Sequence, residues 1–227
     1  MTIEERAFAT LEAAASALAD DLADALREAI SERGRALVAV SGGRTPRHVF
    51  DCLRQLDVDW PRVTVTLTDE RWVPADHPDS NEGLVRSFLL RGPAAAATFI
   101  PLYGGEISPD AGHPACEARL AALARPFDAV YLGLGGDGHF ASLFPGDPAL
   151  DVRDSVCAAV PGTEARQPRM TLTTSAILDA RKVFLLFSGA DKQAVYAKAR
   201  RVGPYRDIPV RLVLGQERTP VSVFKAP

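Results

Sequence analysis

The sequence predicts an α/β fold, in which a doubly wound, mainly parallel sheet carries helices on both faces. Short apolar runs, such as residues 36–40 and 183–187, alternate along the chain with longer amphipathic segments. Such runs are typical of strands that are buried on both faces of a parallel sheet. With 227 residues, 47% of them hydrophobic, the chain can bury one large core. We therefore expect a single domain over residues 1–227.

The N-terminal segment predicts a helix that covers this core. In residues 4–33 apolar side chains recur at spacings of three and four, which indicates one long amphipathic helix that ends at Gly34. The first buried strand follows at residues 36–40. Beyond it, Thr45 would cap a second helix with Pro46 at its first position, where a missing N–H costs nothing.

The following elements are predicted from the same patterns. Residues 63–68 are rich in β-branched side chains and predict the second strand. Ser80 or Asn81 would cap the next helix, and residues 94–97 and 104–114 are expected to be connections. The remaining expected elements are a helix at 115–125, strands at 129–132, 156–160, 169–173, 183–187 and 221–224, a short helix to Ala180 capped by Thr174 or Ser175, and a helix at 191–201.

Charge and cysteine content exclude several classes of protein. The formal net charge is -3, which gives no reason to expect a nucleic acid or a membrane surface as partner. The three cysteines are scattered, without a C-x-x-C pair, and this favours a reducing compartment over a disulfide framework or a zinc site. No apolar run approaches the ~18 residues of a membrane span, and the polar N-terminus does not resemble a secretory signal. We expect a cytoplasmic protein that is a monomer or a small homo-oligomer.

A glycine-rich loop at residues 133–146 dominates the functional analysis. It follows the expected strand at 129–132, and its glycines would let backbone N–H groups approach a ligand. A helix start expected at 141–144 would complete an anion site. The loop also holds Asp137 and His139, and a histidine, which titrates near neutral pH, is a natural general base.

Two other interpretations of this loop are weaker. It matches the dinucleotide fingerprint G-x-G-x-x-G, which expects an acidic residue roughly 20 positions later, at the end of the next strand. Residues 156–161 carry no such acid, and the loop lies past mid-chain. A purely structural glycine turn would leave the placement of Asp137 and His139 unexplained.

A second glycine turn, at residues 41–46, is a candidate phosphate cradle. The N–H groups of Gly42 and Gly43 precede a helix start, and Ser41, Arg44 and Thr45 add further donors. The turn is not a Walker motif, because no Gly-Lys-Ser/Thr sequence follows. The alternative is a tight strand-to-helix turn without a ligand.

Charged residues follow the second and later strands. Asp69, Glu70 and Arg71 come at the carboxyl end of a strand, where ligands bind in open α/β sheets. Arg71 could hold a phosphate or stabilise an oxyanion, although a surface ion-pair cluster is the alternative. Arg169 and Lys192 could be ligands or solvated charges.

The absence of two catalytic motifs excludes some kinds of hydrolase. G-x-S-x-G and H-E-x-x-H are absent, and the four histidines show no metal-ligand spacing, so we expect neither a nucleophile-elbow hydrolase nor a metal. A hydrolase of this kind would have to activate water directly. Its substrate would need a reactive carbonyl, such as that of a lactone.

Taken together, the motifs resemble those of the 6-phosphogluconolactonase family, whose fold is shared with glucosamine-6-phosphate deaminase and ribose-5-phosphate isomerase. The matching segments occur in the family's order; they are 41–46, 69–71 with Ser80 and Asn81 downstream, 133–146 and 169–173. Residues 142–146 follow the lactonase version of the loop, where the deaminases carry Phe-Asn-Glu-Pro. Phe140 stands where the family usually has threonine.

The resemblance implies hydrolysis of 6-phosphogluconolactone to 6-phosphogluconate in the pentose phosphate pathway, without a cofactor. It implies that His139 is the general base, that Asp137 orients it or favours its charged form, and that Arg71 or N–H groups of the loop stabilise the oxyanion. The implied substrate-binding residues are Ser41, Gly42, Gly43, Arg44, Thr45, Asp69, Gly136, Arg169 and Lys192. A phosphosugar isomerase or deaminase, or a non-catalytic sugar-phosphate sensor, remains the alternative.

Overall fold

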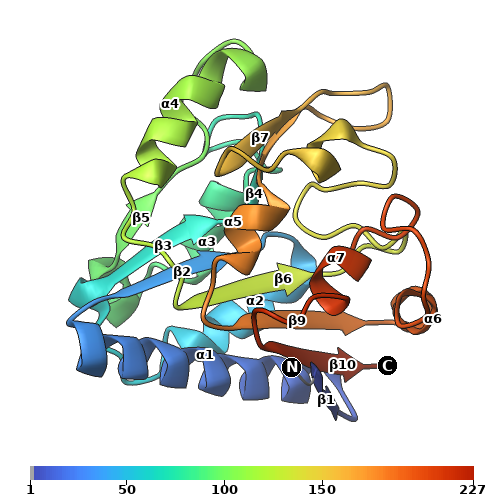
Figure 1. The fold of residues 1–227 in the computed structure, drawn as a ribbon. Helices are drawn as coiled ribbons and strands as arrows, with labels where there is room; N and C mark the ends of the chain where they lie inside the picture. The colour runs from blue at the N-terminus through green and yellow to red at the C-terminus, as the bar shows by residue number, and fades with distance from the viewer. Residues whose placement is uncertain (1–2) are drawn as a thin grey trace.

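The computed structural model describes residues 3–227, except for the side chain of Arg44. Its main sheet has seven strands in the order β1-β10-β9-β6-β2-β3-β5, and all neighbouring strands are parallel. The predicted α/β class is thereby confirmed (Figure 1). The strands are β1 (Ile3–Ala7), β2 (Ala36–Val40), β3 (Val63–Leu67), β5 (Thr98–Ile100), β6 (Ala129–Gly133), β9 (Val183–Ser188) and β10 (Val221–Ala226).

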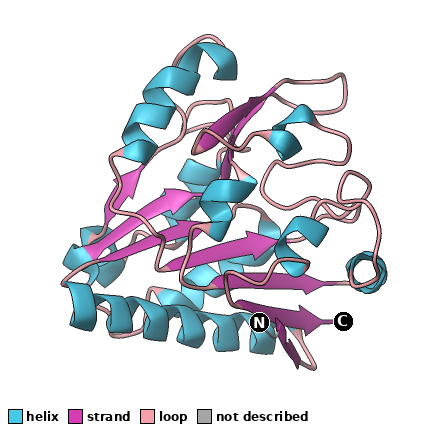
Figure 2. Cartoon of the chain, in the orientation of Figure 1, coloured by secondary structure: helices cyan, strands magenta, loops and turns pink. Residues whose placement is uncertain are grey.

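Helices lie between the strands in the chain and pack against the sheet (Figure 2). The first of them runs the length of the sheet along one face, where it also packs against the second helix. No helix of residues 3–227 combines the length and the apolar character that a membrane span needs. The helices are α1 (Leu11–Arg33), α2 (Arg44–Leu53), α3 (Asn81–Phe88), α4 (Pro109–Ala121), α5 (Thr174–Leu178), α6 (Ala190–Ala199) and α7 (Arg211–Leu214), with 3₁₀ turns η1 (Trp60–Arg62), η2 (Gly92–Ala96) and η3 (Pro148–Asp151).

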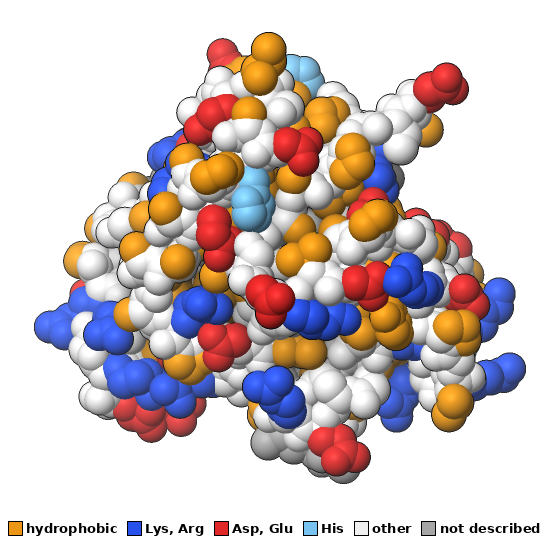
Figure 3. Space-filling view, turned by 45° about the horizontal axis from the view of Figure 1, so that its top comes forward, with side chains coloured by type: hydrophobic (Ala, Val, Ile, Leu, Met, Phe, Trp, Pro, Cys, Tyr) orange, Lys and Arg blue, Asp and Glu red, His pale blue; other side chains and the backbone are white. Residues whose placement is uncertain are grey.

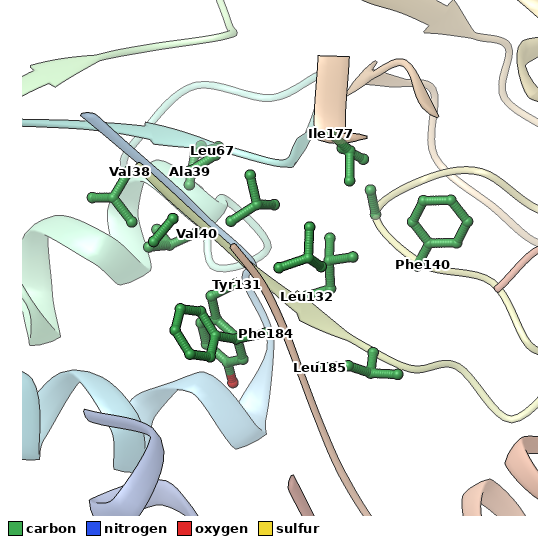
Figure 4. Close-up of a cluster of buried hydrophobic side chains, with 14 of the residues drawn as sticks. Val38, Ala39, Val40, Leu67, Tyr131, Leu132, Phe140, Ile177, Phe184 and Leu185 are labelled. Atoms are coloured by element: carbon green, nitrogen blue, oxygen red, sulfur yellow. The ribbon is translucent and has the colours of Figure 1, made fainter. Parts of the chain in front are cut away.

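The core fills both sides of the main sheet. Figure 4 shows Tyr131 and Phe184 on one side of the central strands, and Leu132 with Ile177 of α5 on the other. Every residue of β2 is buried, which explains why this strand is a continuous apolar run. Phe140, which departs from the family pattern, is fully buried in this core.

A second, antiparallel sheet stands beyond the main one. It consists of β4 (Asp69–Arg71), β8 (Arg169–Leu172) and β7 (Cys157–Val160), in that order. The strands predicted at 156–160 and 169–173 therefore exist but do not join the parallel sheet. The antiparallel register of β4 and β8, with Arg71 opposite Arg169, joins residues about a hundred positions apart.

The predicted helix over residues 4–33 is wrong at its start. Residues Ile3–Ala7 form β1, which pairs in parallel with β10 at the edge of the sheet. Thr10 then caps α1, its hydroxyl accepting a hydrogen bond from the N–H of Ala13 at 3.2 Å. The predicted stop is correct, because Gly34 adopts the left-handed conformation at φ 72°.

Other helix boundaries also differ from the predictions. Gly43, not Thr45, is the N-terminal cap of α2, and Thr173 caps α5. Ser80 caps α3 as predicted. Residues 109–114, expected in a connection, belong to α4, which Ser108 caps. Pro114 lies inside this helix. Because proline is normally a helix breaker, the sequence did not predict a helix over residues 109–114.

The helix expected at 141–144 does not form. Ala141 has a positive φ of 49°, and a tight turn follows in which the N–H of Leu143 donates to the carbonyl of Phe140. Phe140 and Leu143 are both fully buried, so packing fixes this turn. The glycine loop therefore does not end in a helix N-terminus, and the helix contribution expected at an anion site there is wrong.

Candidate active site

A cavity of about 410 Å³ opens at the carboxyl ends of the parallel strands. Segments that follow β2, β3, β6 and β9 reach it, which is where ligands bind in open α/β sheets. Its lining residues are Ser41, Gly42, Gly43, Thr45, Pro46, Asp69, Arg71, Asn81, Gly133, Leu134, Gly135, His139, Ala141, Arg169, Leu186 and Lys192.

The turn after β2 supplies one wall of this cavity. Gly43 caps α2 with a φ of 109°, a conformation that favours glycine. Among the described residues, none accepts a hydrogen bond from the N–H of Gly42 or Gly43. Together with the free N–H groups that begin α2, they offer donors to an anion.

Two residues next to this turn fix its position. A Cβ atom on Gly42 would overlap the side-chain amide of Asn81, so the backbone can approach Asn81 only because residue 42 is glycine. The hydroxyl of Ser41 lies 3.2 Å from Oγ1 of Thr68 and accepts a hydrogen bond from the N–H of Gly133 at 3.4 Å. Ser41 thus joins the turn after β2 to the end of β6.

The small antiparallel sheet supplies the opposite wall. Its register places Arg71 and Arg169 directly across from each other, an arrangement that repulsion between like charges disfavours. Asp69 compensates part of this charge, with its Oδ2 3.6 Å from Nη1 of Arg169. Oδ2 also accepts a hydrogen bond from the hydroxyl of Ser142 at 2.6 Å. An anion between the two arginines would relieve the remaining repulsion.

The guanidinium of Arg169 is held in a confined environment. Burial lowers its pKa, Asp69 opposes this effect, and the positive charges of Arg71 and Arg166 lower the pKa further. Both Arg166 and Arg169 lie over the ring of Phe144, at 4.0 and 5.4 Å from its centroid. Arg169 is therefore held against the cavity wall and is not a freely solvated surface charge.

His139 enters the cavity from the glycine loop. Its Nδ1 lies 2.5 Å from Oδ1 of Asp137, and the same oxygen accepts a hydrogen bond from the His139 backbone N–H at 3.0 Å. Burial alone would raise the pKa of Asp137, but the hydrogen bonds and the charge of His139 outweigh burial and lower it. The carboxylate therefore stays ionised and fixes the direction of the ring.

The glycines of this loop make room for the imidazole. A Cβ on Gly135 would overlap the ring of His139, and a Cβ on Gly138 would lie 2.5 Å from Ile208. Gly138 also has a φ of 86°, and its carbonyl accepts a hydrogen bond from the N–H of Val210 at 2.9 Å. The loop is thus held by its own turns and by the segment before α7.

Glu70, which the sequence predicts only as part of the charged cluster at 69–71, bonds to two cavity residues. Its carboxylate is fully buried and accepts hydrogen bonds from the N–H groups of Arg71 and Asn81, both at 2.8 Å. It also accepts from the N–H of Glu82 at 2.7 Å and the hydroxyl of Ser80 at 3.1 Å. Glu70 thereby joins β4 to the start of α3.

The structure brings most of the predicted site residues into the cavity. Gly136 and Asp137 are not among the lining residues, and Asp137 reaches the cavity only through His139. The side chain of Arg44 is outside the described part of the chain. Asn81 lines the cavity although no ligand role was predicted for it. Its Nδ2 donates a hydrogen bond to the carbonyl of Asp69 at 2.7 Å, and no local sequence pattern predicts this contact.

Comparison with known proteins assigns the chain to a family. Residues 9–221 match the family model described as glucosamine-6-phosphate isomerases/6-phosphogluconolactonase. The chain belongs to this family. A 6-phosphogluconolactonase of Rhizobium meliloti is 40% identical to it over 234 residues, covering 100% of both chains. That of Mesorhizobium japonicum is 43% identical, covering 94% of this chain and 91% of its relative.

Solved structures place the chain among the lactonases of this glucosamine-6-phosphate isomerase/6-phosphogluconolactonase family. A 6-phosphogluconolactonase from Shewanella baltica superposes with a TM-score of 0.96 at 40% identity, covering 100% of this chain and 98% of that one. A monomeric glucosamine-6-phosphate deaminase gives a TM-score of 0.84 at 19% identity, covering 99% and 97% of the two chains. The second likeness concerns the fold alone.

Proposed function

We propose that this protein hydrolyses 6-phospho-D-glucono-1,5-lactone to 6-phospho-D-gluconate, the lactonase step of the oxidative pentose phosphate pathway. One observation carries the proposal: His139, oriented by Asp137, lines the same cavity as the glycine turn at Gly42 and Gly43. A base and an anion cradle thus share one cleft. The full-length relatives called 6-phosphogluconolactonase support the same substrate.

The phosphate group would bind at the turn after β2. The N–H groups of Gly42 and Gly43, which have no acceptor among the described residues, and the hydroxyl of Thr45 suit the oxygens of a phosphate at a helix N-terminus. Arg169 or Lys192 would neutralise its charge, because both side chains line the cavity. Fixing the phosphate there would bring the lactone ring toward His139.

His139 would act as the general base. With the proton on Nδ1 held toward Asp137, Nε2 keeps a free lone pair that can accept a proton from water. The water oxygen bonds to the lactone carbonyl carbon. The carbon–oxygen bond of the ring then breaks, and the ring oxygen takes up a proton to become a hydroxyl group. The products are the free carboxylate and a proton.

The negative charge that develops on the carbonyl oxygen needs a hydrogen-bond donor to stabilise it. Arg71 lines the cavity and its Nη1 donates to the carbonyl of Asp79 at 2.6 Å, which fixes the side chain. A guanidinium held in this way, or N–H groups of the glycine loop, would stabilise the oxyanion. All of these steps use groups of the chain itself.

The decisive experiment is acid release from freshly prepared 6-phosphogluconolactone, measured beside its unphosphorylated counterpart. We expect rapid hydrolysis of the phosphorylated lactone and a much lower kcat/KM for the other. Ammonia release from glucosamine 6-phosphate, or aldose–ketose conversion, without lactone hydrolysis would refute the proposal.

We further propose a cytoplasmic location, since Cys52, Cys116 and Cys157 are free thiols.

A further inference from the structure

A second cluster of chemically reactive side chains lies between α4 and β7, apart from the cavity. His113 and Glu117 are four residues apart on α4 and therefore share one face of the helix. Cys157 of β7 faces them, and the three possible ligand atoms all lie within 4.8 Å of one another. None of the three residues lines the active-site cavity.

The donor atoms of this cluster already point toward one another. Oε2 of Glu117 accepts a hydrogen bond from the Cys157 thiol at 3.4 Å. Nε2 of His113 lies 3.1 Å from the carbonyl oxygen of Cys157. Oε1 of Glu117 accepts from the N–H of Val156 at 2.9 Å, so the carboxylate is oriented before any ion arrives. Oε2 also accepts from the hydroxyl of Ser155 at 2.7 Å and the N–H of Cys157 at 3.0 Å, and an ion bound to Oε2 would displace the hydroxyl. Such support for the ligands is what a metal site requires.

We propose that His113, Glu117 and Cys157 form a zinc site that ties α4 to β7. One imidazole nitrogen, one carboxylate oxygen and one thiolate sulfur are the donors that Zn²⁺ accepts, and they leave one tetrahedral position for water. Calcium and magnesium prefer oxygen ligands alone, so this donor set disfavours them. Cys157 is buried, whereas His113 and Glu117 are half-buried and give the ion a route from solvent.

Zinc binding would release the thiol proton of Cys157 and fix the position of the ring proton of His113. The thiol of Cys157 loses its proton to solvent as sulfur bonds to zinc. His113 offers the Nε2 lone pair, so the ring proton resides on Nδ1. The contacts of Nε2 with the Cys157 carbonyl at 3.1 Å and the Ser155 hydroxyl at 3.2 Å are then given up. Zinc–ligand bonds of about 2.0–2.3 Å also require the three groups to close together by on the order of 1 Å.

The position of the site suggests a structural role. β7 pairs with β8, where Val160 lies opposite Arg169, a residue of the active-site wall. A zinc ion between α4 and β7 would brace the small sheet that presents Arg169 and Arg71. Because no ligand of the ion faces the cavity, binding should raise the melting temperature more than it changes the chemistry.

The test uses the full chain with Zn²⁺ or Co²⁺ as the only added ligand. The His139→Ala variant serves as background, since His139 and Asp137 could themselves bind metal. We expect one Zn²⁺ per chain by equilibrium dialysis, a higher melting temperature with zinc, and a near-ultraviolet thiolate-to-cobalt band with Co²⁺.

Matched variants locate the ion. Cys157→Ser and His113→Gln should weaken zinc binding by more than about 100-fold, because even outer-shell partners typically account for 10–100-fold. Cys52→Ser, a cysteine outside the cluster, should bind as the parent does. Unchanged binding by Cys157→Ser, or less than one zinc per chain, would overturn the proposal. If Cys157→Ser fails to fold, the cobalt spectrum of the parent decides: without the thiolate band the site does not exist.

Discussion

The backbone N–H of Asn81 donates a hydrogen bond to Oε1 of Glu70, with 2.8 Å between the two atoms. Through this bond a fully buried carboxylate fixes the residue whose side chain lies against Gly42. The same oxygen accepts from the N–H of Arg71. One buried acid therefore holds both Arg71 and the residue that lies against the glycine turn.

Glu70 should make the stability of the protein depend on pH. Burial raises its pKa to about 7, and the repulsion of Asp69 adds to this, although N–H donors such as that of Asn81 oppose it. The stability contribution is fully present below the unfolded pKa of about 4.5 and is lost as the pH rises through the folded value. The loss between pH 4.5 and 7 should reach about 3 kcal/mol.

This prediction is checked by urea unfolding from pH 4.5 to 7.5 in the parent and in Glu70→Gln. The variant cannot ionise, so its free energy of unfolding should lack that fall, whatever its absolute stability. Subtracting the two curves removes the contribution of all other titratable groups. Parallel curves would show that Glu70 is ionised throughout and that its N–H donors outweigh burial.

Replacing His139 by alanine should remove the general base. We expect kcat to fall by about 10²–10⁴-fold, while binding of 6-phosphogluconate persists because the phosphate cradle is intact. Steady-state kinetics and calorimetry of product binding measure the two effects. His48→Ala, an exposed histidine of α2 outside the cavity lining, is the control. A His139→Ala enzyme with nearly full turnover would exclude this residue from the mechanism.

Replacing Gly42 by alanine should displace Asn81. The added Cβ would overlap the Asn81 amide, which cannot move without losing its 2.7 Å hydrogen bond to the Asp69 carbonyl. We expect a loss of about 1–3 kcal/mol in stability and a higher KM. Gly133→Ala is the matched control for stability alone, because a Cβ there meets no atom within 4 Å but residue 133 lines the cavity. Equal losses of stability in both variants would mean that overlap at Gly42 is not the cause.

Arg169→Ala should weaken the binding of phosphorylated ligands. A charge-assisted hydrogen bond contributes about 1.5–3 kcal/mol, so KM should rise by about 10–100-fold with a smaller change in kcat. Removing Arg169 also relieves its repulsion with Arg71 in the small sheet. The melting temperature should therefore fall little, although ligand binding is weakened. Arg91→Ala, at a site away from the cavity, should leave KM unchanged. An unaltered KM in Arg169→Ala would assign the phosphate to other residues.

Several features of the site could be predicted because their signals are local. The glycine turns at residues 41–46 and 133–146 follow buried apolar strands, so their approach to a ligand at the sheet edge could be inferred. His139 and Asp137 are two residues apart, and their contact at 2.5 Å needs no distant partner. These two segments, together with residues 69–71, Ser80, Asn81 and 169–173, carry the resemblance to the lactonases.

Other features had no signal in the sequence. His113 and Glu117 share a helix face only because α4 begins at Pro109, and the segment was expected to be a connection. Asn81 was assigned as a possible cap, yet Glu70 directs it toward the cavity.

The sequence by itself determined the α/β class, the buried strands and the glycine turns that end them, because apolar runs and left-handed glycines act through neighbouring residues. Only the tertiary structure decided that residues 3–7 form a strand beside β10 and that Arg71 lies opposite Arg169. Both arrangements depend on hydrogen-bonding partners about a hundred or more residues away, and no local preference specifies which distant strand completes a ladder.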